Sequence, residues 1–288
     1  MSKFSLALDS SQIVAYMTCP QLWKYQYKDN LEPLERKHAA FSKGTLVHSV
    51  LESYYKNIDS GVPTATKCGL DVVDKYRLDY LKDPKCELTK DDLDLIAARF
   101  ILYTAKYQND LVPVVHNGKK VVELGFSYPL VDNDLFLFVL EGRIDLITQS
   151  ERHNCVVDHK SQGRYSKYNA RRVQFLNYAL GMDVNHMMVN VFPLQLKYDD
   201  KNMFRQLFYY SPETMRQWKT KLTQIFFRIA NSIMLSQVER NESACEGKYG
   251  YPCDFCQLCD EHSEQVYNNL IKFKYKKREP WSPWEETE

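Results

Sequence analysis

The 288-residue chain has no apolar run long enough to cross a membrane. Its first residues, MSKFSLALDSSQ, also lack the long apolar segment of a secretory signal peptide, so we expect an intracellular, cytoplasmic protein. Neither sign of charge is in excess, because 38 Lys and Arg residues balance 37 Asp and Glu residues to give a net charge of +1. If this chain binds nucleic acid, a local basic surface must therefore do so.

The periodicity of apolar residues changes along the chain, and this indicates the fold class. Helical spacing predicts two short helices over 8–29 and longer ones over 42–58, 88–108, 169–182 and 212 to about 238. Alternating and continuous apolar runs predict strands over 120–130, 134–148, 154–161, 186–198 and 203–211. We expect an α/β or α+β domain, in which a central mixed β-sheet is flanked by helices.

We expect four regions along the chain. They are an N-terminal helical segment (1–45), a core (46–240) with a helical insertion at about 65–112, a cysteine-rich segment (241–265) and a tail (266–288), whose last part, KKREPWSPWEETE, is polar, proline-broken and expected to be flexible.

Two neighbouring predicted strands carry acidic residues. GRID ends at Asp145, and VVDHKS contains Asp158 with Lys160 two positions later. Side chains two apart in a strand share a face, so Asp158 and Lys160 point the same way, and a hairpin through QSERHN brings Asp145 near Asp158.

Two converging carboxylates repel each other unless a cation lies between them, and Mg²⁺ or Mn²⁺ suits carboxylate oxygen. A lysine beside such an ion can position an attacking water or offset negative charge, which suits the hydrolysis of a phosphodiester. An ordinary surface Asp–Lys pair would give the same short pattern.

Two helical pairs add to this pattern. His48 and Glu52 are four residues apart in GTLVHSVLE, and Gln174 and Tyr178 are four apart in QFLNY. Each pair therefore shares a helix face. Either pair alone is compatible with packing.

In their order, the segments TCPQLWKYQY, GTLVHSVLE, GRID, VVDHKS and QFLNY resemble the PD-(D/E)xK nuclease superfamily. They are most similar to its RecB-type exonuclease branch, which includes phage and CRISPR-adaptation nucleases. The resemblance spans roughly residues 10–262 and implies a restriction-endonuclease-like core. The chain has no GxxxxGK[ST] phosphate loop, so the helicase motor of larger relatives is absent.

The resemblance also implies a role for each site residue. Lys160 would be the catalytic lysine, acting with Asp145 and Asp158, while Gln174 and Tyr178 would complete the catalytic site. The implied metal ligands are His48, Asp145, Asp158 and the backbone carbonyl of His159, with Glu52 as a further candidate.

Four of the eight cysteines crowd into CEGKYGYPCDFCQLC, which favours a metal or cluster over disulfides in a reducing compartment. In several RecB-type nucleases, one cysteine near the N-terminus joins three near the C-terminus around a [4Fe–4S] cluster. The resemblance implies such a cluster here, joining the N-terminal helices to the cysteine-rich segment. Zinc is the alternative metal. The implied ligands are Cys19, Cys253 and Cys259, with Cys256 or Cys245 as the fourth.

We therefore expect a metal-dependent DNA exonuclease that acts on single-stranded DNA or DNA ends in recombination, repair or replication, as phage enzymes do. One alternative is a CRISPR-associated adaptation nuclease that trims spacer precursors. Another is a non-catalytic DNA-binding module with a nuclease fold. Four basic residues between Lys160 and QFLNY are candidates for contacting DNA, although a solvated loop would have the same composition. They are Arg164, Lys167, Arg171 and Arg172.

Overall fold

The computed structural model describes residues 3–34, 39–82, 88–116, 118–150, 153–247 and 252–284. Cys86 and the last four residues of the predicted tail lie outside these ranges. Among the described helices, none combines the length and the apolar character that a membrane crossing requires.

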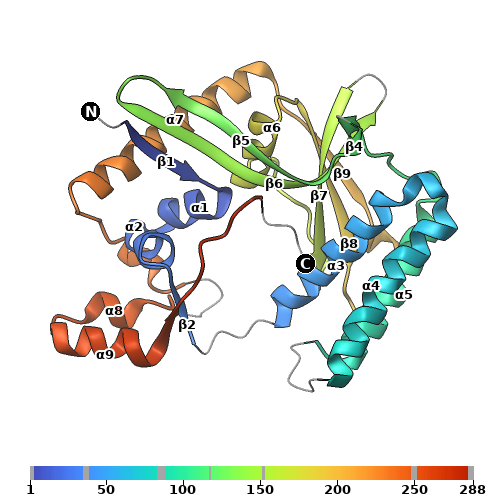
Figure 1. Cartoon of the computed structure of the whole chain (residues 1–288), viewed down its shortest axis with the longest axis horizontal. Helices are drawn as coiled ribbons and strands as arrows, with labels where there is room; N and C mark the ends of the chain where they lie inside the picture. The colour runs from blue at the N-terminus through green and yellow to red at the C-terminus, as the bar shows by residue number, and fades with distance from the viewer. Residues whose placement is uncertain are drawn as a thin grey trace. The chain divides into compact units, whose positions relative to one another are not determined.

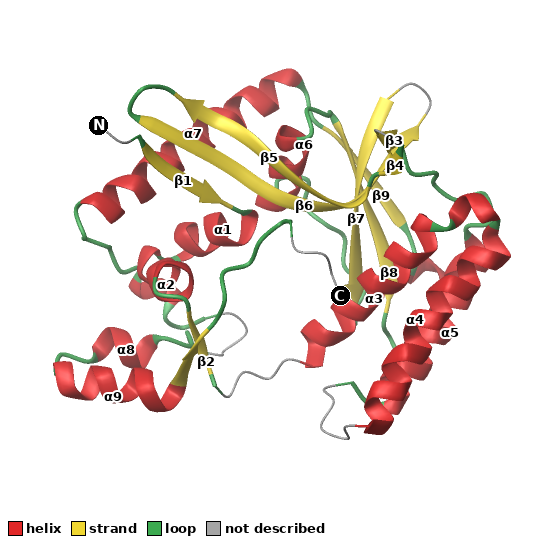
Figure 2. Ribbon diagram, in the orientation of Figure 1, coloured by secondary structure: helices red, strands yellow, loops and turns green. Residues whose placement is uncertain are grey.

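Figures 1 and 2 show how the helices and strands are arranged along the chain. The helices are α1 (Ser10–Thr18), α2 (Pro20–Trp23), α3 (Ala39–Lys56), α4 (Val62–Lys82), α5 (Lys90–Lys106), α6 (Val173–Gly181), α7 (Pro212–Met234), α8 (Cys256–Asp260) and α9 (Glu264–Lys274). The strands are β1 (Phe4–Leu8), β2 (Leu31–Pro33), β3 (Val115–His116), β4 (Lys119–Lys120), β5 (Val122–Asp132), β6 (Phe136–Ser150), β7 (His153–Gln162), β8 (His186–Pro193), β9 (Arg205–Tyr209) and β10 (Tyr275–Lys277).

The chain folds into two compact units. Unit 1 comprises Met1–Lys37, Ser127–Glu141 and Arg216–Ser282, and unit 2 comprises His38–Phe126, Gly142–Met215 and Pro283–Glu288. All of the predicted catalytic and metal-binding residues belong to unit 2, and all of the predicted cluster cysteines belong to unit 1.

The main sheet is mixed. Its strands are hydrogen-bonded in the order β1-β6-β7-β8-β9, and β5 pairs with β6. β6 and β7 are antiparallel, β7 and β8 are parallel, and β8 and β9 are antiparallel. The parallel pair requires a crossover, and α6 provides it. This arrangement confirms the predicted mixed α/β fold.

The core of unit 2 fixes the strands that carry the acidic residues. The predicted apolar stripe of α3 is fully buried, and it packs in one cluster with Leu146 of β6 and Val157 of β7. These two residues directly follow Asp145 and precede Asp158 in the chain. The members of the α3 stripe are Leu46, Val47, Val50, Leu51 and Tyr54.

Helix ends follow the predicted capping signals. Thr89 Oγ1 accepts from the amide of Asp92 at 3.2 Å, and Asp92 Oδ2 accepts from the amide of Thr89 at 3.1 Å, which completes the capping box of α5. Pro20 begins α2, and Ser211 Oγ caps α7 through the amide of Thr214 at 3.1 Å.

Two helices are shorter than predicted. α6 begins at Val173 rather than near Asn169, because the side chain of Asn169 accepts from the amide of Arg171 and holds a turn there. α7 ends at Met234 rather than Val238, because Ser236 adopts a left-handed conformation with φ of 53°.

Unit 1 contains elements that were not predicted. β1 pairs in parallel with the first part of β6, from Phe4 opposite Phe136 to Leu8 opposite Leu140. The segment after residue 265, expected only as a tail, forms α9 and then β10, which pairs with β2.

Gly142, the first residue of GRID, allows an aromatic ring to approach closely. A Cβ atom at this position would lie 2.6 Å from Cε1 of Phe126, and no real Cβ contact is that short. The ring of Phe126 is buried and packs edge-on against Tyr178 at 6.1 Å between centroids. Gly142 thus allows Phe126 to support the helix that carries Tyr178.

We predict that Gly142→Ala lowers the free energy of unfolding by about 1–3 kcal/mol, because the added methyl group overpacks this contact. Gly163→Ala is the matched control, since nothing lies within 4 Å of a Cβ built there. Urea denaturation followed by circular dichroism measures both. Equal stability of the two variants would contradict the packing role of Gly142.

Candidate active site

Three ligand groups converge from different elements of unit 2. His48 lies on α3, Glu123 on β5 and Asp145 on β6. His48 Nδ1 is 3.5 Å from Asp145 Oδ2 and 3.7 Å from Glu123 Oε1, and one ligand atom from each residue lies within 4.8 Å of the others. One imidazole and two carboxylates form a donor set that fits a divalent cation such as Mn²⁺ or Mg²⁺.

Glu123 was missed by the sequence analysis. Its φ is 50°, which interrupts the regular alternation of β5, so the strand pattern does not give the direction of its side chain. A left-handed non-glycine residue costs about 1–3 kcal/mol, and such strain gathers at functional sites. An acidic residue in the otherwise apolar stretch VVELGF was the available signal.

Asp145 and Asp158 lie where β6 and β7 stop pairing. The ladder between the strands reaches Leu146 opposite Val157, and the two aspartates are the next residue on each strand. Lys160 Nζ lies 2.9 Å from Oδ1 and 2.7 Å from Oδ2 of the fully buried Asp158. Asp158 and Lys160 thus share a face, as their spacing predicts, and Asp158 pairs with Lys160 rather than joining the group of three ligands.

The backbone of His159 is bound to the same site. Its amide donates to Asp145 Oδ2 at 2.5 Å, which joins the two strands beyond the end of their ladder. Its ring stacks on Tyr55 at 5.4 Å with an interplanar angle of 7°. The residue whose carbonyl is predicted to bind the metal is therefore held through both its amide and its side chain.

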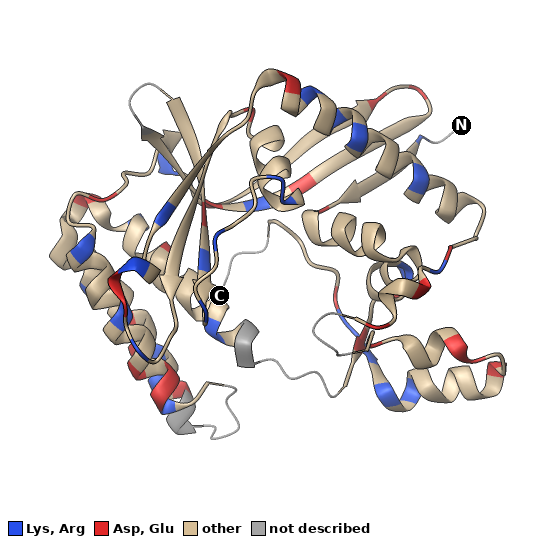
Figure 3. Ribbon diagram, turned by 180° about the vertical axis from the view of Figure 1, so that it is seen from behind, with Lys and Arg blue, Asp and Glu red and all other residues tan. Residues whose placement is uncertain are grey.

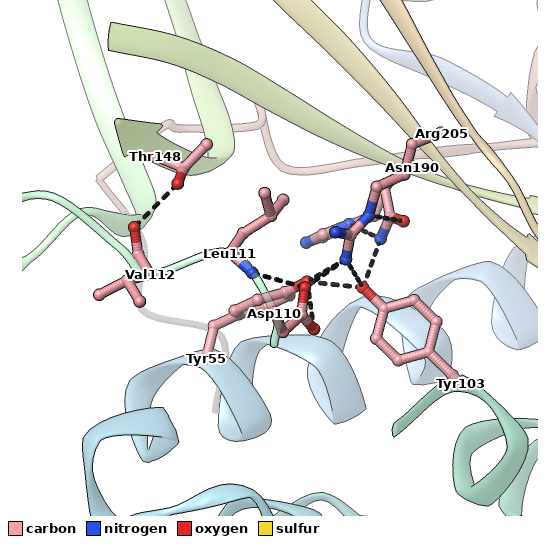
Figure 4. A network of polar contacts seen from close by, with 9 residues as sticks. Tyr55, Tyr103, Asp110, Leu111, Val112, Thr148, Asn190 and Arg205 are labelled. Atoms are coloured by element: carbon pink, nitrogen blue, oxygen red, sulfur yellow. Dashed lines mark hydrogen bonds and ion pairs between the residues drawn. The ribbon is translucent and has the colours of Figure 1, made fainter. Parts of the chain in front are cut away.

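A buried polar network anchors the ring of His159. Arg205 forms an ion pair with Asp110 and donates to Oδ1 of Asn190 at 3.2 Å (Figure 4). Asn190 Nδ2 then lies 2.9 Å from Nδ1 of His159 and 2.9 Å from the hydroxyl of Tyr103. Since an amide nitrogen only donates, Nδ1 of His159 accepts and the ring proton lies on Nε2. Burial lowers the pKa of His159 to about 3, so this ring is neutral.

The ionisation of the site reflects its excess of buried carboxylates. Burial disfavours the imidazolium of His48, but Asp145 and Glu123 outweigh this and raise the pKa of His48 to about 10. Burial raises the pKa of Glu123 to about 7, and it raises the pKa of Asp158 to about 6 against the attraction of Lys160. Protons bound to these side chains thus compensate the negative charge of the carboxylates, which a bound divalent cation would otherwise compensate.

The remaining predicted site residues lie as follows. Glu52 forms an i,i+4 ion pair with Lys56 at 2.6 Å and is not one of the three convergent ligands. Gln174 Nε2 donates to the hydroxyl of Tyr178 at 2.8 Å, as their four-residue spacing allows. Burial, and then the charges of Asp158 and Asp145, keep the pKa of Tyr178 well above its ordinary value, so the hydroxyl retains its proton.

The four predicted basic residues are exposed on the loop between β7 and α6. Two glutamine side chains fix this loop, because Gln162 bonds both backbone groups of Ser166 at 3.0 and 3.3 Å, and Gln206 bonds both of Tyr168 at 2.9 and 3.0 Å. Elsewhere, Lys and Arg are interspersed with Asp and Glu along the ribbon (Figure 3).

In unit 1, five cysteines line a single cavity, and each has a free thiol. The amide of Asn241 donates to Sγ of Cys19 at 3.4 Å, and the guanidinium of Arg240 donates to Sγ of Cys245 at 3.5 Å. Cys256 instead directs its Sγ to the carbonyl of Cys245 at 3.6 Å. The five residues are Cys19, Cys245, Cys253, Cys256 and Cys259.

The fold and the convergent ligands define a metal-binding α/β protein, and comparison with known families gives the class. Residues 8–260 match the family model of the PD-(D/E)XK nuclease superfamily, and the chain belongs to this superfamily. No curated protein sequence matches the chain significantly.

Two solved structures are similar to this chain. One is described as a "putative exonuclease" from Eubacterium rectale, with 11% identity, a TM-score of 0.51 and coverage of 90% of each chain. The other is SSO0001, with 12% identity, a TM-score of 0.36 and coverage of 87% of this chain and 85% of the other. At 11% identity, the first likeness supports the fold. The RecB-type branch stays a prediction.

We predict that Asp110→Ala lowers the free energy of unfolding by about 3–5 kcal/mol, because it leaves the guanidinium of Arg205 buried without its partner. Asp200→Ala is the control, since it removes an exposed partner of Lys106 and should have a much smaller effect. Denaturant titrations of both variants provide the measurement. A similar loss in each would show that the buried pair does not stabilise the strands around His159.

Proposed function

We propose that this protein is a metal-dependent deoxyribonuclease, an exonuclease that hydrolyses phosphodiester bonds of single-stranded DNA or DNA ends. The observation that carries the proposal is the convergence of His48, Glu123 and Asp145 beside the Asp158–Lys160 pair. Membership of a nuclease superfamily supports a nucleic acid as the substrate.

The chemistry divides between the metal ligands and the lysine. A bound Mg²⁺ or Mn²⁺ would acidify a water molecule and stabilise charge on a phosphoryl oxygen. His48 and Asp145 would hold it, with Glu123, Asp158 and the carbonyl of His159 as the further ligands available.

Lys160 keeps its proton in this environment. Burial disfavours its ammonium, but Asp158 outweighs this and raises the pKa of Lys160. Lys160 thus serves as a charged donor that orients the attacking water or offsets developing negative charge, rather than as a general base. The hydroxyl of Tyr178, held by Gln174, lies in the same electrostatic environment and supplies a second donor, which is neutral.

The biological setting we favour is phage-type recombination, repair or replication. The cysteine spacing favours it over spacer trimming, because position 262, where the commonest spacing in the family would have a cysteine, is His262. Retention of the ligands and of Lys160 argues against a purely DNA-binding module. The exposed, fixed loop with Arg164 and Lys167 would add phosphate contacts whose strength falls with salt.

We also propose that the five-cysteine cavity of unit 1 holds a [4Fe–4S] cluster. Cys253, Cys256 and Cys259 have the C-x2-C-x2-C spacing that ferredoxin-type clusters use, and this favours the cluster over tetrahedral zinc. We favour Cys245 as the fourth ligand, because Arg240 donates a hydrogen bond to its sulfur, as the outer partners of metal ligands do.

We predict that the wild-type protein degrades end-labelled DNA when Mn²⁺ is added and that Lys160→Ala slows cleavage by at least about 100-fold. Asp145→Asn should abolish cleavage and weaken Mn²⁺ binding in calorimetry. Lys201→Ala, which removes an exposed lysine paired with Asp199, should leave the rate unchanged. Equal cleavage by the wild type and Lys160→Ala would indicate a contaminant, and no cleavage by either would favour the non-catalytic module.

We predict that protein purified without oxygen is brown, absorbs light at about 400 nm and contains iron and sulfide. Cys19→Ser should lose the colour and stability, whereas Cys68→Ser, a change to a cysteine outside the cavity, should keep both. Loss of colour in Cys245→Ser but not in Cys256→Ser would identify the fourth ligand. Colourless wild-type protein with stoichiometric zinc would contradict the cluster.

A further inference from the structure

Unit 2 contains a cleft with a volume of about 680 Å³. One of its lining residues, Glu123, also belongs to the candidate metal centre. Basic side chains from α3, β4 and β6 line other parts of it, and Trp284 lies at the C-terminal end of the described chain. The basic members are Lys56, Lys119, Lys120 and Arg143.

The C-terminal segment docks specifically on this cleft. Arg143 donates through Nε and a terminal nitrogen to the carbonyl of Pro283 at 3.2 and 3.1 Å. Gly125 makes room for the segment, because a Cβ atom there would lie 2.5 Å from that carbonyl oxygen and 3.0 Å from the ring of Trp284. Pro283 is buried, whereas Trp284 remains 60% exposed.

The charge of the cleft suits a polyanion. Four cationic side chains line it against two carboxylates, those of Glu52 and Glu123. Lys56 pairs with Glu52, and Lys120 pairs with Asp59, while Lys119 is exposed to solvent. A basic groove with an aromatic face is the combination that binds single-stranded nucleic acid, because phosphates meet the cations and bases stack on the ring.

We propose that this cleft binds single-stranded DNA beside the scissile phosphate, with a base stacked on Trp284 and the phosphates facing Lys119 and Lys120. The proposal rests on the proposed nuclease function, because Glu123 joins the cleft to the metal centre. It gives the C-terminal segment a role in holding the substrate. If the DNA instead had to displace the segment, the same docking would block the cleft. The experiment distinguishes a segment that holds the DNA from one that blocks its binding.

The test measures binding by the full chain in EDTA, where cleavage is absent, with fluorescence anisotropy of labelled oligonucleotides. The probes are an oligothymidylate of about twelve nucleotides, within the usual site size of single-strand binders, and an abasic oligomer of equal length. Trp284→Ala should weaken oligothymidylate binding by about 5- to 150-fold, the loss of one stacked base, and leave abasic binding unchanged. Trp284→Phe should restore most of the affinity.

Trp281→Ala is the matched control, because Trp281 is 49% exposed and is not a cleft-lining residue. Unchanged oligothymidylate binding by Trp284→Ala, tighter binding by it, or no binding by the wild type would each overturn the proposal. Mn²⁺-dependent cleavage by the wild type is measured separately. If the wild type cleaves DNA but Trp284→Ala binds oligothymidylate normally, only the stacking proposal is wrong. If Trp284→Ala weakens oligothymidylate binding but the wild type does not cleave DNA, only the nuclease proposal is wrong.

Discussion

The site depends on carboxylates buried where two strands part. Asp145 and Asp158 lie next to the last paired residues of β6 and β7, and burial there removes the water that would screen their repulsion. Each carboxylate therefore needs a compensating group. Asp145 has the imidazole of His48 and the amide of His159, and Asp158 has the ammonium of Lys160. The same geometry suits the binding of a divalent cation, which would compensate this charge.

The strands can hold this arrangement because the surrounding structure stabilises it. One side is apolar, since the buried face of α3 packs against Leu146 and Val157. The other is polar, and there Asp110, Arg205 and Asn190 form a chain of contacts that ends on the ring of His159. The apolar contacts are non-directional, whereas the hydrogen bonds set the orientation of the ring and the strand.

Local patterns predicted those parts of the molecule that local forces determine. The buried stripe of α3, the capping box at Thr89 and the shared face of Asp158 and Lys160 follow from spacing alone. β1 and β10 were missed because their partners, β6 and β2, lie far away in the sequence. Glu123 was missed because a left-handed residue breaks the alternation on which strand predictions depend, and such strained conformations are common where side chains must converge on a site.

The cysteine cavity is explained by the small core around it. Its apolar cluster contains few fully buried side chains, among them Tyr25, Phe255 and Leu258, and the pairing of β2 with β10 adds only three residues on each strand. Small clusters of this kind rarely bury enough apolar surface to offset the conformational entropy of the chain, so proteins often stabilise them with a metal or with cross-links. Thiolates from both ends of the chain would supply such a cross-link, and a metal held by them would contribute its binding free energy to folding. In this proposal the cysteines stabilise unit 1, while the acidic residues of unit 2 carry out the chemistry.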